Sequence, residues 1–330
     1  MRDEPAPATT PSPSLSPARR RAPAAALEGR PILLATDGSA CANAAARVTA
    51  ALATERRAVP HVLRVLDLSA YAIPAPLPGI VVAADVMVGR DVRAPDADAL
   101  RAELGRLVGG AVAWPVATAI GSPAHTILEE SARVGANLVV MGIRHHDFVE
   151  RALRDETTLA VMRRAACPVL GVTPSRDGLP RRALVGTNFG RASTAAARAA
   201  LSVLAPGGRL LVAYVQPPHF DDGEPGEGAS MVRELGIHAA FRRVIGDLER
   251  GSDVTIEPVI AECTPGVGTA GELLALSDRT QADLLVVGSQ RHVRFDRWLL
   301  GSVTTDLARD GRHSLLVVPP HREPEPAPRR

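Results

Sequence analysis

Two glycines, and the small hydroxyl residues after the second of them, form the clearest candidate site in the sequence. Gly288 ends an apolar segment, and Gly301-Ser302-Val303-Thr304 follows at the expected start of the last helix. A glycine at a helix start lets an anion approach the backbone closely, and the free N–H groups and hydroxyls there can hold a phosphate. Because a glycine-serine pair is also a common helix cap, the pattern taken alone fits either a phosphate site or an ordinary cap.

All 38 basic residues of the chain are arginine, and there is no lysine. This excludes the chemistry of a lysine Schiff base, the P-loop lysine that binds phosphate, and the protein kinases, which need a lysine on a strand. A phosphate site in this chain therefore depends on backbone amides, small hydroxyls or arginine.

A histidine-rich segment and three cysteines are the other candidates for chemistry. His145, His146 and Asp147 are adjacent, but neighbouring side chains on a loop rarely converge on one ion, so we expect no metal site. The cysteines are too few and too scattered for a disulfide framework or a zinc site, which fits a reducing cytosol. No Ser-His-Asp arrangement can be assembled by spacing, and we expect no enzyme. The three cysteines are Cys41, Cys167 and Cys263.

The charge and hydropathy patterns argue against nucleic acid and membranes as partners. The formal net charge is +2, and the excess lies in the tails: the first 30 residues hold five arginines against three acidic residues, and the last ten hold three against two. The rest of the chain, residues 31–320, is nearly neutral and lacks the basic face that a nucleic-acid-binding surface needs. No apolar run approaches the roughly 18 residues of a membrane span, and none follows Arg19–Arg21 as in a secretory signal. We therefore expect a cytoplasmic protein.

The sequence repeats itself in two halves. The segment 136–142 (ANLVVMG) corresponds to 282–288 (ADLLVVG), and 167–174 (CPVLGVTP) corresponds to 313–320 (HSLLVVPP), both at a spacing of 146 residues. One spacing that holds across two strands and the helix between them indicates an internal repeat. Pro- and Arg-rich segments flank and separate the halves, and they are too polar to form a core. The expected organisation is a disordered tail (1–29), a first domain (30–174), a linker (175–181), a second domain (182–320) and a disordered tail (321–330).

Each half alternates strands with helices, and its strands are continuous apolar runs. This pattern is typical of an α/β fold with a parallel, doubly wound sheet that carries helices on both faces. Ligands of such sheets bind beyond the carboxyl ends of the strands, so the residues after the first and fourth strands of each half are the ones to consider. The strands are expected near 31–36, 60–66, 111–119, 137–142 and 168–173, and near 182–187, 209–215, 253–261, 283–288 and 314–318.

A set of segments spread over both halves carries a family resemblance. They are ILLATDGS (32–39), GSP with the helix after it (121–134), NLVVMG (137–142), CPVLGV (167–172), LLVVGSQ (284–290), LLGSVTTDLA (299–308) and SLLVVPP (314–320). Together they resemble the universal stress protein family, as a tandem two-domain member, over nearly all of 31–320. The resemblance implies two flavodoxin-like (adenine nucleotide alpha hydrolase-like) domains, each with five parallel strands, whose fifth strands pair across the interface of an internal pseudo-dimer.

The resemblance also implies a nucleotide motif, of which the second half retains the larger part. The motif of nucleotide-binding members is Gly, two residues, Gly, nine residues, Gly, then Ser or Thr, with an Asp at the end of the first strand that meets the adenosine. Gly288, Gly301 and Ser302 have this spacing, but Arg291 replaces the middle glycine and Asn188 replaces the Asp. Asn188 can still bond a ribose hydroxyl. Arg291 could either grip a phosphate or fill the cavity of the loop.

The first half has lost more of the motif. It keeps Asp37 and Gly142, but His145 stands at the middle glycine and Asp155-Glu156 replaces the glycine-serine pair. Two carboxylates at the place of the phosphates would repel them. We expect that the first half does not bind a triphosphate.

These observations favour a stress-response regulator or sensor that binds ATP in its second half without dedicated catalysis. The alternative is a scaffold of the same fold whose two sites have decayed and which acts through protein partners. An ATP-consuming enzyme is a third interpretation, although no base or metal set is evident, and the chain could in addition form a homodimer. The candidate nucleotide-binding residues are Thr187, Asn188, Val215, Val287, Gly288, Arg291, Gly301, Ser302, Val303 and Thr304, with Thr36, Asp37 and Gly142 as weaker candidates in the first half.

Overall fold

The structure is a computed structural model of the chain. It describes residues 26–67, 96–143, 151–217, 227–250, 252–289 and 301–320; for 151–156 and 227–230 it describes the backbone alone. No helix within these described ranges is long and apolar enough to cross a membrane.

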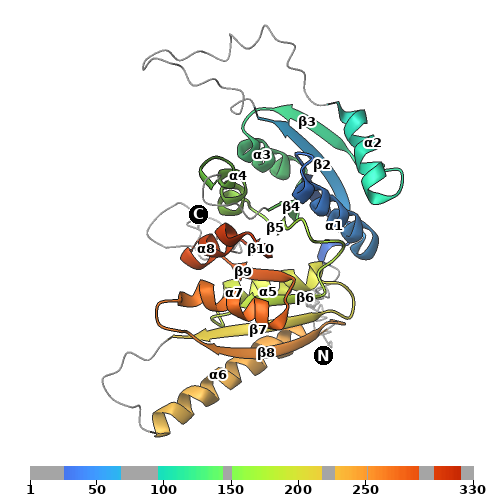
Figure 1. Ribbon diagram of the computed structural model, residues 1–330. Coiled ribbons are helices and arrows are strands. Elements are labelled where there is room, and N and C mark those ends of the chain that lie inside the picture. The colour runs from blue at the N-terminus through green and yellow to red at the C-terminus, as the bar shows by residue number, and fades with distance from the viewer. Residues whose placement is uncertain are drawn as a thin grey trace, which may run out of the picture.

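Ten strands form one sheet that runs through the whole molecule (Figure 1). The order is β3-β2-β1-β4-β5-β10-β9-β6-β7-β8, so that each half contributes five adjacent strands. Within each half all strand pairs among the described residues are parallel, which confirms the doubly wound α/β fold. The strands are β1 (Pro31–Ala35), β2 (Val59–Leu66), β3 (Val116–Ile120), β4 (Val139–Gly142), β5 (Val169–Val172), β6 (Arg182–Gly186), β7 (Arg209–Gln216), β8 (Thr255–Glu262), β9 (Leu284–Gly288) and β10 (Ser314–Val318).

The helices cover both faces of this sheet. Alternate residues of each strand point to opposite faces: Ile32 and Leu34 of β1 join one buried cluster, whereas Leu33 joins the other. The first cluster includes side chains of α1, α2, α5 and α6, and the second includes side chains of α3, α4, α7 and α8. The helices are α1 (Ala40–Arg56), α2 (Ala97–Val108), α3 (Pro123–Arg133), α4 (Arg151–Arg164), α5 (Arg191–Val203), α6 (Glu227–Leu248), α7 (Gly268–Thr280) and α8 (Ser302–Asp310).

All ten expected strands are present, and the third is shorter than expected. It begins at Val116 instead of near residue 111. The preceding helix ends at Gly109 in a left-handed conformation with φ of 77°, and Pro115 has no N–H to donate to a strand ladder. The chain therefore enters the sheet only after Pro115, whose carbonyl accepts the Val62 N–H at 2.8 Å.

The two halves meet at β5 and β10, which pair antiparallel. Leu170 of β5 lies opposite Leu316 of β10, and both are almost fully buried. Beside this pair, the hydroxyls of Thr173 and Ser314 lie 3.2 Å apart, and the Thr173 N–H donates to Ser314 Oγ at the same distance. The fifth strands thus pair across the interface, as the family resemblance implies.

Candidate functional site

The turn after β6 is shaped by its own polar side chains. The Thr187 hydroxyl accepts the Phe189 N–H at 2.9 Å and donates to Ser193 Oγ at 3.1 Å. The side chain of Asn188 is exposed, and its Oδ1 accepts the Gly190 N–H at 3.0 Å. Because Gly190 is the N-cap of α5, Thr187 and Asn188 build the turn that leads into this helix.

The first half builds the same turn with Thr36 and Asp37. Thr36 Oγ1 accepts the Gly38 N–H at 3.2 Å, and Asp37 Oδ1 accepts the Ser39 N–H at 2.9 Å. Asp37 is exposed, whereas Thr36 is buried. Asp and Asn form such turns equally well, so the exchange of Asp37 for Asn188 between the halves preserves the shape of the turn and removes one negative charge.

Phe189 is a feature of this turn that reasoning from the sequence missed. Its φ of 60° is left-handed, and the first half has Gly38 there with φ of 78°. A non-glycine residue pays a conformational penalty in this region, which is offset here by aromatic contacts: the Phe189 ring centroid lies 5.0 Å from that of Tyr214 and 4.9 Å from that of Phe241. One feature of the sequence could have revealed this position: Phe189 aligns with a glycine, Gly38, when the two halves of the repeat are compared.

The motif glycines at the ends of β4 and β9 are required by packing. A Cβ on Gly288 would lie 2.4 Å from the carbonyl oxygen of Ala192, in the first turn of α5. A Cβ on Gly142 would lie 2.7 Å from Cys41 Cβ, in the first turn of α1. Both halves therefore need a glycine here so that the helix can approach the sheet, whether or not a ligand binds.

Gly301 is in a different situation. It is the N-cap of α8 with φ of −58° and ψ of 158°, a backbone conformation that any residue can adopt. No atom of the residues that the structure describes lies within 4 Å of the place where its Cβ would be. Neither packing among the described residues nor backbone conformation calls for a glycine at this position, and no described residue occupies the place of its Cβ in front of the helix start.

The hydroxyls and apolar residues around Gly301 differ in exposure. Ser302 is exposed at the start of α8, whereas Thr304 is only 4% exposed. Val303 packs on the core cluster at the α7–α8 face of the sheet, and so does Val215 near the end of β7. Ser302 is therefore the hydroxyl that an incoming anion could reach directly.

The sheet brings the candidate residues of the second half to one edge. β9 lies between β6 and β10, with Val185 opposite Val286 and Gly288 opposite Val318. Thr187 and Gly288 thus follow neighbouring strands, and Val287 is buried beside Gly288 in β9. The segment 290–300, which contains Arg291, lies outside the described residues.

The structure gives little information on the remaining residues that the sequence singled out. His145, His146 and Asp147 lie outside the described residues, and for Asp155 and Glu156 the structure shows only that they belong to α4. Among the residues that the structure does describe, no group of three or more His, Cys, Asp or Glu side chains could hold a metal ion.

The cysteines are free thiols in the described structure. Cys41 is buried beneath the end of β4, in contact with the position of Gly142. Burial raises the pKa of the Cys167 thiol to about 11, so that this thiol stays protonated at neutral pH. Since the thiolate is the nucleophile, Cys167 is an unreactive, structural residue.

Comparisons with known proteins agree with this architecture. A model of the universal stress protein family matches the chain twice, over residues 29–173 and 180–319. A universal stress protein from Archaeoglobus fulgidus DSM 4304 aligns over 88% of this chain and 98% of its own, with 19% identity and a TM-score of 0.57. A protein of unknown function from Pseudomonas aeruginosa PAO1 aligns over 90% and 94%, with 17% identity and a TM-score of 0.54.

A comparison with curated proteins finds no match. The two structural likenesses show a shared fold, and the family model identifies the sequence in both halves. The chain belongs to the universal stress protein family, as a member with two tandem domains.

Proposed function

We propose that the second half binds an adenine nucleotide, ATP in the first place, and that the protein is a cytoplasmic regulator or sensor of the stress response. It responds to the nucleotide without turning it over. The observation that carries this proposal is Gly301, the one motif glycine described in the second half that the fold itself does not explain.

The surroundings of Gly301 support a phosphate at this place. The first turn of α8 contains no acidic residue, and the positive end of the helix dipole favours an anion there. The Ser302 hydroxyl is exposed beside it. The adenosine part would lie toward the turn after β6, where Asn188 is exposed at the end of the neighbouring strand.

Asn188 and Gly288 favour the second candidate function, a scaffold that binds protein partners without a nucleotide. The Asn188 Oδ1 atom already accepts the Gly190 N–H, and Gly288 is explained by its packing on Ala192. If the turn contact and the packing on Ala192 are the only roles of Asn188 and Gly288, the nucleotide motif is a remnant that no longer binds a ligand. The two functions make different predictions for Gly301: its replacement should impair a nucleotide-binding protein and leave a scaffold unaffected.

Calorimetric titration of the full chain with ATP tests the proposal. We expect binding, and we expect Gly301→Val to weaken it about tenfold or more, because the side chain fills the space in front of the helix. Gly236→Val is the matched control: Gly236 also has open space around it but lies in α6, so its variant should bind like the parent.

Two results would contradict the proposal. Absence of binding at millimolar ATP would favour the scaffold, and so would equal affinities of Gly301→Val and the parent. A third measurement concerns catalysis: we expect phosphate release from ATP to stay at the level of the buffer, and release that is lost on Ser302→Ala would instead indicate an enzyme.

A further inference from the structure

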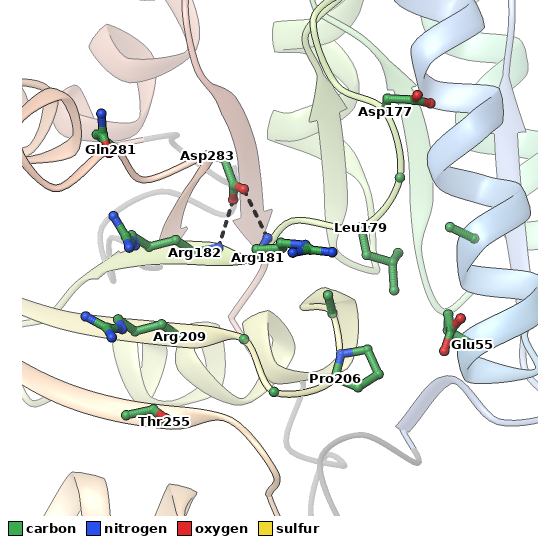
Figure 2. Close-up of a pocket in the computed structure, with 15 residues that line it drawn as sticks. Glu55, Asp177, Leu179, Arg181, Arg182, Pro206, Arg209, Thr255, Gln281 and Asp283 are labelled. Carbon is green, nitrogen blue, oxygen red and sulfur yellow. Dashed lines mark hydrogen bonds between the residues drawn. The ribbon is translucent and has the colours of Figure 1, made fainter.

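Two arginines lie side by side at the amino edge of the second half, where its strands begin. Arg182 is the first residue of β6 and Arg209 is the first residue of β7, and they are partners in the parallel register. Thr255, the first residue of β8, is in turn the register partner of Arg209. In-register neighbours point to the same face of a sheet, and Figure 2 shows both guanidinium groups on one side of the strands.

The fold does not require charge at these positions. In the first half the corresponding first residues of β1 and β2 are Pro31 and Val59, which are register partners in the same way. Like charges directly opposite each other on neighbouring strands destabilise a sheet. The Arg182–Arg209 pair is therefore a property of the second half that the repeat of the fold leaves unexplained.

Among the described residues, each guanidinium has a partner that orients it. Arg182 Nη1 donates to the carbonyl of Thr280, the last residue of α7. Arg209 Nε lies 3.4 Å from Glu257 Oε1. A guanidinium carries five N–H donors in a planar fork that matches carboxylate and phosphate oxygens. These contacts orient the two groups and leave further donors on each.

The pair borders a cavity of about 890 Å³, a size suited to a small molecule. The Gln281 amide and the Thr255 hydroxyl line it on the same side as the two arginines, and Glu55 of α1 lines it from the first half (Figure 2).

Asp283 is the acidic residue of the cavity nearest to the start of β6, and its charge is compensated. Its carboxylate pairs with Arg176 at 2.9 Å. It also accepts the N–H groups of Arg181 and Arg182 at 3.0 and 3.1 Å (Figure 2). A bound anion would therefore face the guanidinium groups without an uncompensated carboxylate at this point.

We propose that this cavity binds a small molecule with a multivalent oxyanion group, which bridges Arg182 and Arg209. The site lies at the opposite edge of the sheet from the proposed nucleotide site, and it is separate from that function. An anion between the two guanidinium groups removes the repulsion between them and uses donors that are already oriented. Because Glu55 belongs to the first half, the cavity that holds this site is lined by both halves of the chain.

Calorimetric titration of the full chain with pyrophosphate at constant ionic strength tests this inference. We expect binding, and we expect about a tenfold or larger loss on Arg209→Val, which installs the residue that the first half has at this register position. Arg209→Gln, which keeps the side chain as far as Cδ and a polar group but removes the charge, should lose binding to a similar degree. Arg243→Ala, which removes an exposed arginine of α6 that does not line the cavity, should bind like the parent.

The Gly301→Val variant separates this site from the nucleotide site. It should keep pyrophosphate binding, while Arg209→Val should keep ATP binding. The proposal is overturned if the parent does not bind pyrophosphate or citrate, if Arg243→Ala loses as much affinity as Arg209→Val, or if Gly301→Val alone abolishes binding. A parallel titration with citrate distinguishes the source of the oxyanion: tighter binding of pyrophosphate indicates a phosphorylated ligand, and tighter binding of citrate indicates a polycarboxylate.

Discussion

At the scale of single residues, the motif glycines of this protein have different physical reasons. Gly142 and Gly288 allow the first turns of α1 and α5 to approach the ends of β4 and β9. At Gly301, by contrast, a Cβ would meet no atom of the described part of the chain. The sequence motif treats all three glycines alike, but only Gly301 supports the presence of a ligand.

Substitution of Gly288 by alanine tests the packing role. The new Cβ would overlap the backbone carbonyl of Ala192, at 2.4 Å, and a backbone atom cannot rotate away. We expect a loss of about 2–3 kcal/mol in the free energy of unfolding, measured with urea. Gly236→Ala is the control, since Gly236 has open space in the helix α6 and alanine there should add up to about 1 kcal/mol. Equal stability of Gly288→Ala and the parent would show that α5 can move away from β9.

At the scale of the elements, the antiparallel pair of β5 and β10 joins two parallel half-sheets into one. The pair is short, since three residues of each strand are register partners. Its polar contacts are buried: Thr173 is 5% exposed and Ser314 is 2% exposed. Buried polar groups cost free energy unless they are bonded, so the Thr173–Ser314 contact specifies how the two halves align.

Substitution of Ser314 by alanine removes the acceptor of the Thr173 N–H in a buried place. We expect the free energy of unfolding to fall by about 1–3 kcal/mol, which is the usual effect of an unsatisfied buried donor. Thr54→Ala is the control, because the exposed Thr54 hydroxyl donates to the Ala50 carbonyl within α1, and its loss should change stability by less than about 0.5 kcal/mol. If both variants unfold at the same urea concentration, the Thr173–Ser314 contact does not stabilise the junction of β5 and β10.

At the scale of the whole molecule, the absence of lysine reduces the number of groups that titrate at alkaline pH, near pH 10. Lysines ordinarily titrate near pH 10.4, so in most proteins they obscure the titration of a single thiol in that range. This chain has no lysine, two tyrosines and three cysteines. Burial raises the pKa of Cys167 from 9.0 to about 11, and the effect of this one group on stability can therefore be measured.

The sign of the effect follows from proton linkage. Between pH 9 and pH 11 the unfolded chain loses the Cys167 proton while the folded chain keeps it, so that stability falls as the pH rises through this range. We expect a loss on the order of 2 kcal/mol by pH 11, measured by urea unfolding at a series of pH values. Cys167→Ser should remove most of this dependence and Cys263→Ser should not; the same slope in the parent and in Cys167→Ser would refute the assignment.

Much of the fold was predictable from the sequence, because it depends on local patterns. The alternation of apolar strands with helices, the repeat at one spacing and the family segments such as ILLATDGS indicate the order of elements and the two half-sheets. The beginning of β3 was not predicted correctly, because an apolar stretch alone does not show that the chain joins the ladder only after Pro115.

The sequence by itself determined which phosphate chemistry is available to this protein, since it contains no lysine and places Gly301 and Ser302 at a helix start. The tertiary structure decided which residues serve the fold and which remain for a ligand. Gly288 meets Ala192, and Arg182 meets Arg209, only when the strands and helices are assembled in register. Such contacts join residues that are far apart in the chain, and no periodicity along the sequence specifies the distance between them.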